Sequence, residues 1–321
     1  MLNTCIVTGG AGAVGSRLTQ RLLDAGAETV YVVDDLSSGY RWLLPDDPRV
    51  QFIQADVVDF FGGDFDAADA HIFHLAAFFA NQNSVDHPLD DLHTNGAGTL
   101  QVLKWAAEHN AKRVVYSSAG CSIAGHGIEG PIAEDMPVSL HLDTPYQITK
   151  ALGEFYCNYY LERVSSVRCR FFNSYGPGEV PGRYRNVIPN FIWLALHDRP
   201  LTITGTGEET RDFIFVDDLV EGLIRCASVE AAHGQAINLG TGRETRVIDL
   251  AKMVIALTES SSEILYAPRR SWDNSKTRQA DITRAREILE LAPDTVLDTG
   301  LAHTVDWFRQ HRPSIAQATD F

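Results

Sequence analysis

Tyr146 and Lys150 are the side chains of this sequence best suited to general acid and base catalysis at a hydroxyl group. They stand four residues apart at the start of a stretch with helical periodicity, so one face of a helix presents both. A tyrosine hydroxyl is a poor base at neutral pH, but a nearby ammonium and a bound cationic cofactor both favour its phenolate. We predict that Tyr146 is a general acid and base and that Lys150 assists it.

A glycine-rich turn near the N-terminus predicts a dinucleotide site. The apolar run at 4–8 leads into Gly9, Gly12 and Gly15, and a helical stripe follows. Glycines let the backbone approach a pyrophosphate closely, and the helix N-terminus offers it free N–H groups. The next β-rich run ends in Asp34, whose carboxylate can accept a hydrogen bond from a ribose hydroxyl.

The residues after this second run favour NAD over NADP. Asp35 follows Asp34, and no Lys or Arg appears before Arg41, so a 2′-phosphate would meet negative charge. Asp56 closes the third β-rich run, where we expect it to contact adenine; a helix cap is the alternative role.

The order of the elements predicts the fold. Apolar, β-rich runs recur at 4–8, 29–34, 50–54, 71–76, 112–117 and 167–172, with helical stretches at 14–25, 95–109 and 146–163. This alternation predicts an α/β, Rossmann-type doubly wound parallel sheet. Helical stretches near 187–197, 217–230, 247–258, 281–290 and 299–310 then predict a smaller, mostly helical lobe. We place an NAD-binding domain at 1–174, with a return of 212–240 to it, and a substrate lobe at 175–321.

The composition excludes several classes of protein. The 321 residues carry a formal net charge of −15, which gives nucleic acid and anionic membranes no attractive field. The five cysteines lack the spacing of a metal site and indicate a reducing cytoplasm. No apolar run is long enough to span a membrane, and no leader-like segment opens the chain. We expect a cytoplasmic protein without a metal site.

Together these motifs resemble the extended short-chain dehydrogenase/reductase family, in particular its nucleotide-sugar epimerases and dehydratases, over nearly the whole chain. The resemblance implies that Tyr146 and Lys150 are catalytic and that Ser118, beside Ser117 at a strand end, supplies the catalytic hydroxyl. Asn95 stands where the family places an asparagine near the active site, and a helix cap is the alternative. A homodimer through the helices at 95–109 and 146–163 is also implied.

The resemblance also implies the residues of two binding sites. The NAD site takes in the glycine turn, the strand ends and the catalytic helix: Gly9, Gly12, Ala13, Val14, Gly15, Asp34, Asp35, Ser38, Asp56, Val57, Leu75, Ala76, Ala77, Asn95, Ser117, Tyr146, Lys150 and Phe172. The site for a nucleotide sugar, with a UDP-sugar favoured, takes in Ser118, Asn173, Asn186, Val187, Ile203, Arg211, Arg270 and Asp273. Arginines suit a diphosphate, although surface ion pairs are the alternative and Arg269 is an alternative to Arg270.

The residues after the catalytic hydroxyl bear on the reaction. The resembling dehydratases carry Asp-Glu there and the decarboxylases a Glu at the second position, whereas this chain has Ala119 and Gly120. Because neither can transfer a proton, the sequence favours epimerisation through a 4-keto sugar, and we expect a 4-epimerase that acts on a UDP-hexose. A 4,6-dehydratase or a UDP-glucuronate decarboxylase stays open as the alternative.

Two loops leave that alternative open. The loop before Tyr146 holds Glu129, Glu134 and Asp135, any of which could supply a displaced acid or base, and Cys121 is a further candidate. The polar run at 78–85 predicts a loop that either recognises sugar hydroxyls or is simply solvated. A position that gates sugar size is expected near 275–277, without a firm assignment.

Two other classes of protein compete with a nucleotide-sugar enzyme. A non-catalytic NAD-sensing regulator would have no need of Ser118, Tyr146 and Lys150 together. An NADPH-dependent reductase of small carbonyl compounds conflicts with the acidic pair that ends the second β-rich run.

Overall fold

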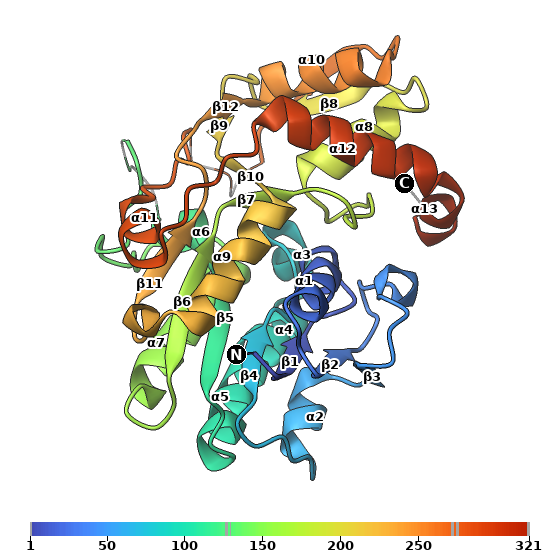
Figure 1. Cartoon of the computed structure of the whole chain (residues 1–321). Coiled ribbons are helices and arrows are strands. Elements are labelled where there is room, and N and C mark those ends of the chain that lie inside the picture. Colours follow the sequence, from blue (N-terminus) through green and yellow to red (C-terminus); the bar gives the residue numbers. More distant parts are fainter. Residues whose placement is uncertain (1, 126–127, 129, 271–272, 274–275, 320–321) are drawn as a thin grey trace.

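The computed structural model describes residues 2–125, 128, 130–270, 273 and 276–319 (Figure 1). At its centre lies a seven-stranded parallel sheet in the order β11-β6-β5-β4-β1-β2-β3. The strands are β1 (Thr4–Thr8), β2 (Thr29–Asp34), β3 (Val50–Gln54), β4 (His71–His74), β5 (Arg113–Ala119), β6 (Ser166–Phe171) and β11 (Ala236–Leu239). This confirms the predicted α/β, Rossmann-type doubly wound sheet.

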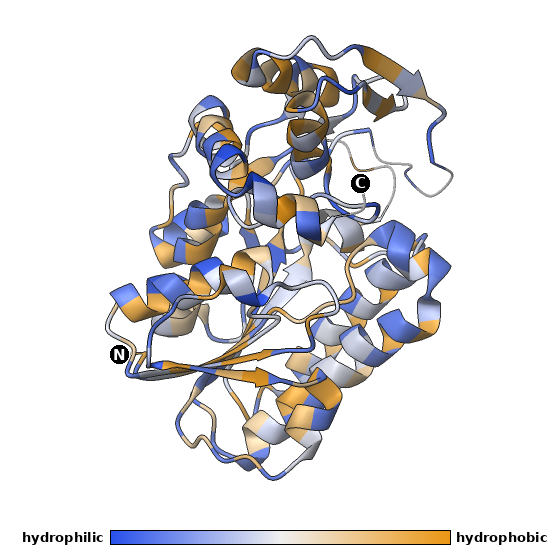
Figure 2. Ribbon diagram, turned by 90° about the vertical axis from the view of Figure 1, so that its right-hand side faces the viewer, coloured by the Kyte–Doolittle hydropathy of each residue, from blue (hydrophilic) through white to orange (hydrophobic). Residues whose placement is uncertain are grey.

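Helices cover both faces of the sheet. One face carries α1 (Ala13–Asp24) and α9 (Val216–Ser228); the other carries α2 (Val57–Gly62), α5 (Thr99–Glu108) and α7 (Pro145–Tyr160). Alternate strand residues point to opposite faces, so Val7 and Val115 enter one hydrophobic core while Ile6 and Val114 enter the other. Figure 2 shows orange, hydrophobic strands between layers of helices in which hydrophilic and hydrophobic residues alternate.

The C-terminal part packs helices against short strand pairs. Its helices are α8 (Val187–Ala195), α10 (Val247–Thr258), α11 (Thr283–Leu289), α12 (Leu297–Gln310) and α13 (Arg312–Ala318). The pairs, which the sequence did not predict, are β7 (Asn173–Tyr175) with β10 (Phe213–Phe215), β8 (Leu201–Thr204) with β13 (Ile264–Ala267), and β9 (Thr210–Arg211) with β12 (Thr245–Arg246). Helix α9 and strand β11 come from the segment 212–240, and β11 joins the central sheet beside β6. The domain boundary near 174 stays a prediction.

Short helical segments complete the chain. They are η1 (Arg41–Leu43), α3 (Asn81–Asp86), α4 (Pro88–Asp91), the π-helical turn η2 (Leu92–Gly98), α6 (Gly120–Ile123) and η3 (Glu230–Ala232). Across the described ranges, no helix combines the length and the apolar character that a membrane span requires.

Helix α7 begins where its sequence specifies a start. The Thr144 hydroxyl accepts from the Gln147 N–H, and Pro145 occupies the first turn, where its missing N–H costs nothing. The buried Tyr116 hydroxyl of β5 donates to the Lys150 carbonyl at 3.2 Å. These contacts hold the first turns of α7 against the end of β5, where the predicted catalytic residues lie.

Candidate active site

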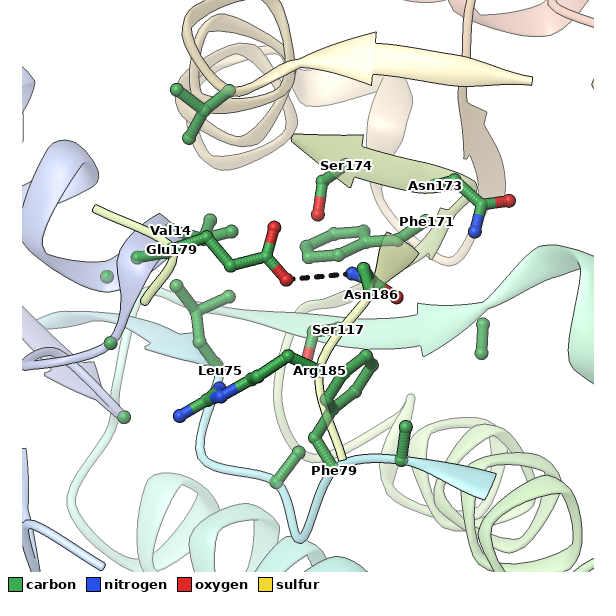
Figure 3. Close-up of a pocket in the computed structure, with 18 of the residues that line it drawn as sticks. Val14, Leu75, Phe79, Ser117, Phe171, Asn173, Ser174, Glu179, Arg185 and Asn186 are labelled. Atoms are coloured by element: carbon green, nitrogen blue, oxygen red, sulfur yellow. Dashed lines mark hydrogen bonds between the residues drawn. The ribbon is translucent and has the colours of Figure 1, made fainter. Parts of the chain in front are cut away.

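A cavity extends along the carboxyl ends of β1, β5 and β6, where parallel sheets of this kind bind their ligands. The glycine turn, the end of β5, the start of α7 and the chain that follows β6 line it (Figure 3). A second cavity adjoins it at the ends of β2 and β3. Asp34 and Ser38 line both, so the two cavities share a wall.

The glycine turn fits a dinucleotide. Gly9 has φ +65°, and a Cβ there would lie 2.7 Å from the Ala76 nitrogen, so only glycine suits this close approach. Gly12 precedes α1 and provides no side-chain cap, which leaves first-turn N–H groups to bind an anion. The Asp34 carboxylate accepts from the Ala11 N–H at 2.9 Å and braces the turn against β2. Burial raises the pKa of Asp34, and backbone hydrogen bonds partly oppose that rise.

Nearly all of the predicted cofactor residues line one of the two cavities. They are Gly9, Gly12, Ala13, Val14, Gly15, Asp34, Asp35, Ser38, Asp56, Val57, Leu75, Ala76, Ala77, Ser117, Tyr146, Lys150 and Phe172. Asp56 also takes its alternative role, because its carboxylate caps α2 by accepting from the Val58 N–H at 2.7 Å. His93, which the sequence did not single out, lies 3.4 Å from that carboxylate.

Asn95 is the predicted cofactor residue that lines neither cavity. Its amide nitrogen donates to Asp91 Oδ1 at 2.7 Å, and its Oδ1 accepts from the Phe78 N–H at 2.8 Å. Asp91 in turn accepts from the Thr149 hydroxyl on α7 at 2.7 Å. The side chain of Asn95 therefore ties the chain after β4 to the catalytic helix. It lies inside η2, so it is not a helix cap either.

Tyr146 and Lys150 project from α7 into the cavity, as their spacing predicts. The Lys150 ammonium donates to the Ser117 carbonyl at 2.8 Å and lies 5.7 Å from the Tyr146 ring centre. Burial lowers the pKa of Lys150 to about 8, and the charge of Asp91 partly opposes that change. The ammonium is thus a desolvated charge beside the tyrosine, where its electrostatic effect is strong.

The two serines of β5 face opposite ways. The Ser117 hydroxyl donates to the His74 carbonyl at 2.9 Å. The Ser118 hydroxyl donates to Glu154 Oε1 at 2.5 Å, and Glu154 forms a bidentate pair with Arg170 at 2.9 and 2.8 Å. Ser118 lines the cavity, but its proton points to a buried ion pair.

The predicted substrate residues divide into two groups. Ser118, Asn173 and Asn186 line the cavity, while Val187, Ile203, Arg211, Arg270 and Asp273 lie outside its lining. Arg211 pairs with Asp273 at 3.1 Å. Ile203 is fully packed in β8. Two arginines that the sequence did not single out line the cavity instead: Arg185, and Arg278, which binds the same Asp273 carboxylate at 3.3 Å.

The segment that follows Arg278 is anchored by the buried Asp212 carboxylate. Asp212 accepts from the N–H groups of Thr241, Gly242 and Ala280, which joins the segment before α11 to β10. The Arg278 Nε and the Asn173 Oδ1 are buried and have no hydrogen-bond partner among the described residues. A donor and an acceptor thus stay unsatisfied at the predicted substrate end of the cavity.

Two predictions concern the segment at 78–85, expected to recognise sugar hydroxyls or to be solvated, and the segment at 121–135, expected to hold a displaced acid or base. Residues 81–86 form helix α3 rather than a loop; Asn81 lines the cavity, and the amides of Gln82 and Asn83 bond within this segment. Glu134 accepts from the Asn238 N–H at 2.7 Å and, like Asp135, lies outside the cavity lining. Glu129, Ser275 and the side chain of Cys121 lie outside the described part of the structure.

The comparisons with known proteins agree with this site. The model of the NAD dependent epimerase/dehydratase family matches residues 5–240, a span that includes the glycine turn, Tyr146 and Lys150. The chain belongs to this family. The predicted resemblance and the prediction of NAD as the cofactor are thereby confirmed.

Three proteins illustrate how far the similarity extends. The chain is 36% identical over 315 residues to UDP-glucose 4-epimerase of Mycolicibacterium smegmatis, covering 95% of this chain and 98% of that protein. It is 31% identical over 325 residues to UDP-N-acetyl-alpha-D-glucosaminuronate decarboxylase of Bacillus cytotoxicus, covering 97% and 99%. The structure of an epimerase from Methanothermobacter thermautotrophicus superposes with a TM-score of 0.93 at 44% identity, covering 99% and 96%.

Sequence reasoning missed several cavity residues of this family member: Ser122, Glu179, Arg185 and Arg278. Ser122 and Arg278 lie beyond the motifs that carried the resemblance, Arg278 eight residues after Arg270. In Figure 3, Glu179 and Asn186 point toward one another, and Arg185 extends toward Leu75. The Asn186 amide donates to Glu179 Oε1 at 3.0 Å. No single motif could have identified Glu179, because its burial depends on the segment after β7 packing against the glycine turn, where Gly178 lies close to Ala13.

Glu179 should make the stability of this epimerase/dehydratase family member depend on pH. Burial raises the pKa of Glu179 from 4.5 to about 7, and Arg185 and Asn186 only partly oppose this. The unfolded chain therefore releases this proton at lower pH than the folded chain, so stability is lost as pH rises from about 4.5 to about 7. Glu179→Gln removes this cost. Glu179→Gln should have a higher unfolding free energy than the unchanged protein. We expect this difference to be about 2 kcal/mol larger at pH ~8 than at pH ~5.5.

Urea denaturation of both proteins at the two pH values checks this prediction. Glu287→Gln, at an exposed position of α11, is the matched control and should show no comparable growth. An advantage of Glu179→Gln that is equal at both pH values would contradict the assignment of this proton to Glu179.

Proposed function

We propose that this protein is an NAD-dependent 4-epimerase of a nucleotide-activated sugar, acting on a UDP-hexose through a transient 4-keto intermediate. The observation that carries the proposal is the cavity shared by the glycine turn, the pair Tyr146 and Lys150, and a buried arginine. When bound, NAD supplies a hydride acceptor that later returns the hydride. The residues of the chain have to orient the sugar and move one proton.

Tyr146 is the proton-transfer group of this proposal. Its phenolate oxygen accepts the proton of the sugar hydroxyl during oxidation, and the resulting phenol returns the proton after the keto sugar has turned over. Lys150 favours the phenolate, because its buried ammonium lies beside the ring and water screens its charge only weakly. Since each proton and hydride removed is restored, product and substrate have the same mass.

The residues that follow Ser118 favour epimerisation over elimination. Ala119 lines the cavity and Gly120 begins α6, and neither carries a group that can transfer a proton. Dehydration and decarboxylation both need an additional acid or base near the neighbouring sugar carbons. Glu134 and Asp135 lie outside the cavity lining. Dehydratase and decarboxylase activities are the alternatives that the assay below distinguishes.

Arg278 and Asn173 bind the nucleotide sugar in this proposal. A guanidinium with an unsatisfied Nε suits the oxygens of a diphosphate, and Asn173 Oδ1 is left to accept from a hydroxyl. Asn186, at the start of α8, lines the same cavity. Arg211 pairs with Asp273, the carboxylate that also binds Arg278, and in this proposal it positions Arg278. Arg270 and Val187 lie outside the cavity lining. The protein acts in the cytoplasm on this proposal, since its cysteines indicate a reducing compartment.

The test is an assay of the purified protein with UDP-glucose, UDP-N-acetylglucosamine and UDP-glucuronate. Products are analysed by mass spectrometry and by proton NMR. An isomer of unchanged mass is the expected result, and it names the substrate. Loss of water or of carbon dioxide would replace epimerisation by one of the two alternatives. Absence of any conversion, with NAD bound, would favour a non-catalytic NAD-sensing protein.

We also propose that the protein is a homodimer through α7 and the neighbouring segment of α4 and η2. Ile148, Phe155 and Tyr159 recur along α7 with exposed fractions of 53%, 54% and 62%, and Leu89 and Leu92 next to it are 78% and 50% exposed. Apolar side chains at helical spacing on one surface are typical of an interface between subunits.

A charge placed in this surface should separate the subunits. We expect Phe155→Glu to elute and scatter light as a monomer, whereas the unchanged protein does so as a dimer, because burying an unpaired carboxylate is costly. Leu140→Glu, at a site that is 95% exposed and outside this surface, is the control and should leave the dimer intact. A monomeric unchanged protein would refute the proposal.

A further inference from the structure

Residues 176–186, between β7 and α8, form a segment that crosses the glycine turn. At one end of it, a Cβ on Gly178 would lie 3.2 Å from the Ala13 Cα, so the segment packs on the first residue of α1. At the other end, the Arg185 guanidinium donates to the Ser38 carbonyl at 2.6 Å. The segment therefore spans the part of the cavity where the N-terminus of α1 offers its N–H groups to an anion.

The loop that holds Ser38 lies against the same turn. The Tyr40 N–H donates to the Ala11 carbonyl at 2.8 Å, which joins the loop after β2 to the residue before Gly12. In Figure 3 the Arg185 side chain extends toward Leu75, which follows β4. The Arg185 guanidinium thus lies beside the turn that fits a pyrophosphate.

Negative charge surrounds this end of the site. Four aspartates line the second cavity: Asp34, Asp35, Asp56 and Asp90. A cation near the turn would offset their repulsion of a bound diphosphate. Among the described residues, three lysines and arginines line the two cavities: Lys150, Arg185 and Arg278. Lys150 lies on the catalytic helix and Arg278 pairs with Asp273, so Arg185 is the cation at the turn.

Within the described part of the chain, no ion pair takes up the charge of Arg185. Its guanidinium donates to a neutral carbonyl, which leaves further N–H groups for a ligand. Its charge acts on the Glu179 carboxyl, but Glu179 accepts its hydrogen bond from Asn186 at 3.0 Å. A guanidinium can bind phosphate oxygens through two N–H groups at once, and such charge-assisted hydrogen bonds are strong.

We propose that Arg185 binds the diphosphate of NAD and, together with the Ser38 carbonyl, fastens residues 176–186 over the bound cofactor. The backbone N–H groups of the glycine turn then bind the diphosphate from one side and Arg185 binds it from the other. Arg185 takes no part in moving the proton. The inference concerns the cofactor, so it does not depend on which sugar the protein converts.

The rate at which bound NAD exchanges tests this inference without turnover. The protein is loaded with radiolabelled NAD, and loss of label is followed after an excess of unlabelled NAD is added. We expect Arg185→Met to release NAD about 10- to 10²-fold faster, because it loses charge-assisted hydrogen bonds to a phosphate. Arg185→Lys keeps the charge without the planar fork and should fall between the two. At about 1 M salt the difference should shrink several-fold, because the Debye length falls to about 3 Å.

Arg183→Met is the matched control. Arg183 lies on the same segment, its side chain is 76% exposed, and it pairs with Asp86 at 3.5 Å, outside the cavity lining. This variant should exchange NAD at the rate of the unchanged protein. If Arg185→Met also exchanges NAD at that rate, or if both arginine variants accelerate release equally, the inference is wrong.

A crystal structure of the protein with NAD and a nucleotide sugar gives a second readout. We expect the Arg185 guanidinium within about 3.2 Å of a phosphate oxygen of NAD. A guanidinium that stays on the Ser38 carbonyl alone, or that binds the diphosphate of the sugar nucleotide, would overturn the inference. If the protein converts no nucleotide sugar, the proposed function fails, while NAD exchange and the position of Arg185 still decide this inference.

Discussion

Tyr146→Phe is expected to reduce turnover at least ~10³-fold while NAD stays bound. The substitution removes one oxygen and keeps the ring that packs edge-on against Phe79, so the cavity retains its shape. General acid and base catalysis by a positioned side chain contributes about 10²–10⁴ in rate. Tyr116, whose ring also lies near the Lys150 ammonium, donates its hydroxyl to the Lys150 carbonyl and lies outside the cavity lining. The rate of product formation by NMR and the NAD released on denaturation are the two measurements.

The control for this variant is Tyr266→Phe, which removes a hydroxyl that is part of a 58% exposed residue of β13. Its turnover should match that of the unchanged protein. Full activity in Tyr146→Phe would refute the proton transfer assigned to this residue. Loss of NAD along with activity would indicate that the substitution damages the cofactor site instead.

Arg170→Met should destabilise the fold by about 3–5 kcal/mol, because it leaves Glu154 as an uncompensated buried charge. The two side chains are 7% and 3% exposed, and two hydrogen bonds join them. The Arg170 guanidinium also donates to the Glu134 carbonyl at 3.0 Å, so the substitution loosens the segment that follows α6 as well. Urea denaturation monitored by circular dichroism measures the loss.

A double substitution separates the missing charge from the missing packing. Arg170→Met with Glu154→Met replaces the ion pair by apolar side chains, and it should recover at least about 2 kcal/mol of the loss. Arg246→Met is the surface control, because its pairs with Glu208 and Asp249 are about half exposed and should contribute less than about 1 kcal/mol. A double variant no more stable than Arg170→Met would show that packing, not the unpaired carboxylate, causes the loss.

Local patterns in the sequence predicted the parts of the site that lie within one element. The glycine turn, Asp34 and the pair on α7 each depend on residues within a few positions of one another, so periodicity and turn chemistry suffice to find them. The strands at 4–8, 29–34 and 50–54 coincide with those of the structure. The parallel orientation of the strands then follows, because strands that alternate with helices pair in parallel.

The hydrogen-bond partners of the predicted catalytic hydroxyl could not be predicted in the same way. Ser117 and Ser118 are adjacent residues of one type, and the difference between them arises from Glu154 and Arg170, which come from other elements. Only when α7 and β6 meet does the proton of Ser118 acquire a carboxylate partner. The same holds for Asn95, whose amide is taken up by Asp91 and by the chain after β4.

The sequence by itself determined the fold class, the cofactor and the proton-transfer pair, because each is specified by residues close along the chain. The tertiary structure alone decided that Arg185 and Arg278 reach the cavity, that the Ser118 hydroxyl meets Glu154, and that Glu179 is buried in the cavity wall. The physical reason is that hydrogen-bond partners and desolvation are properties of neighbours in space. For Ser118 and Glu179 those neighbours come from other elements of the fold.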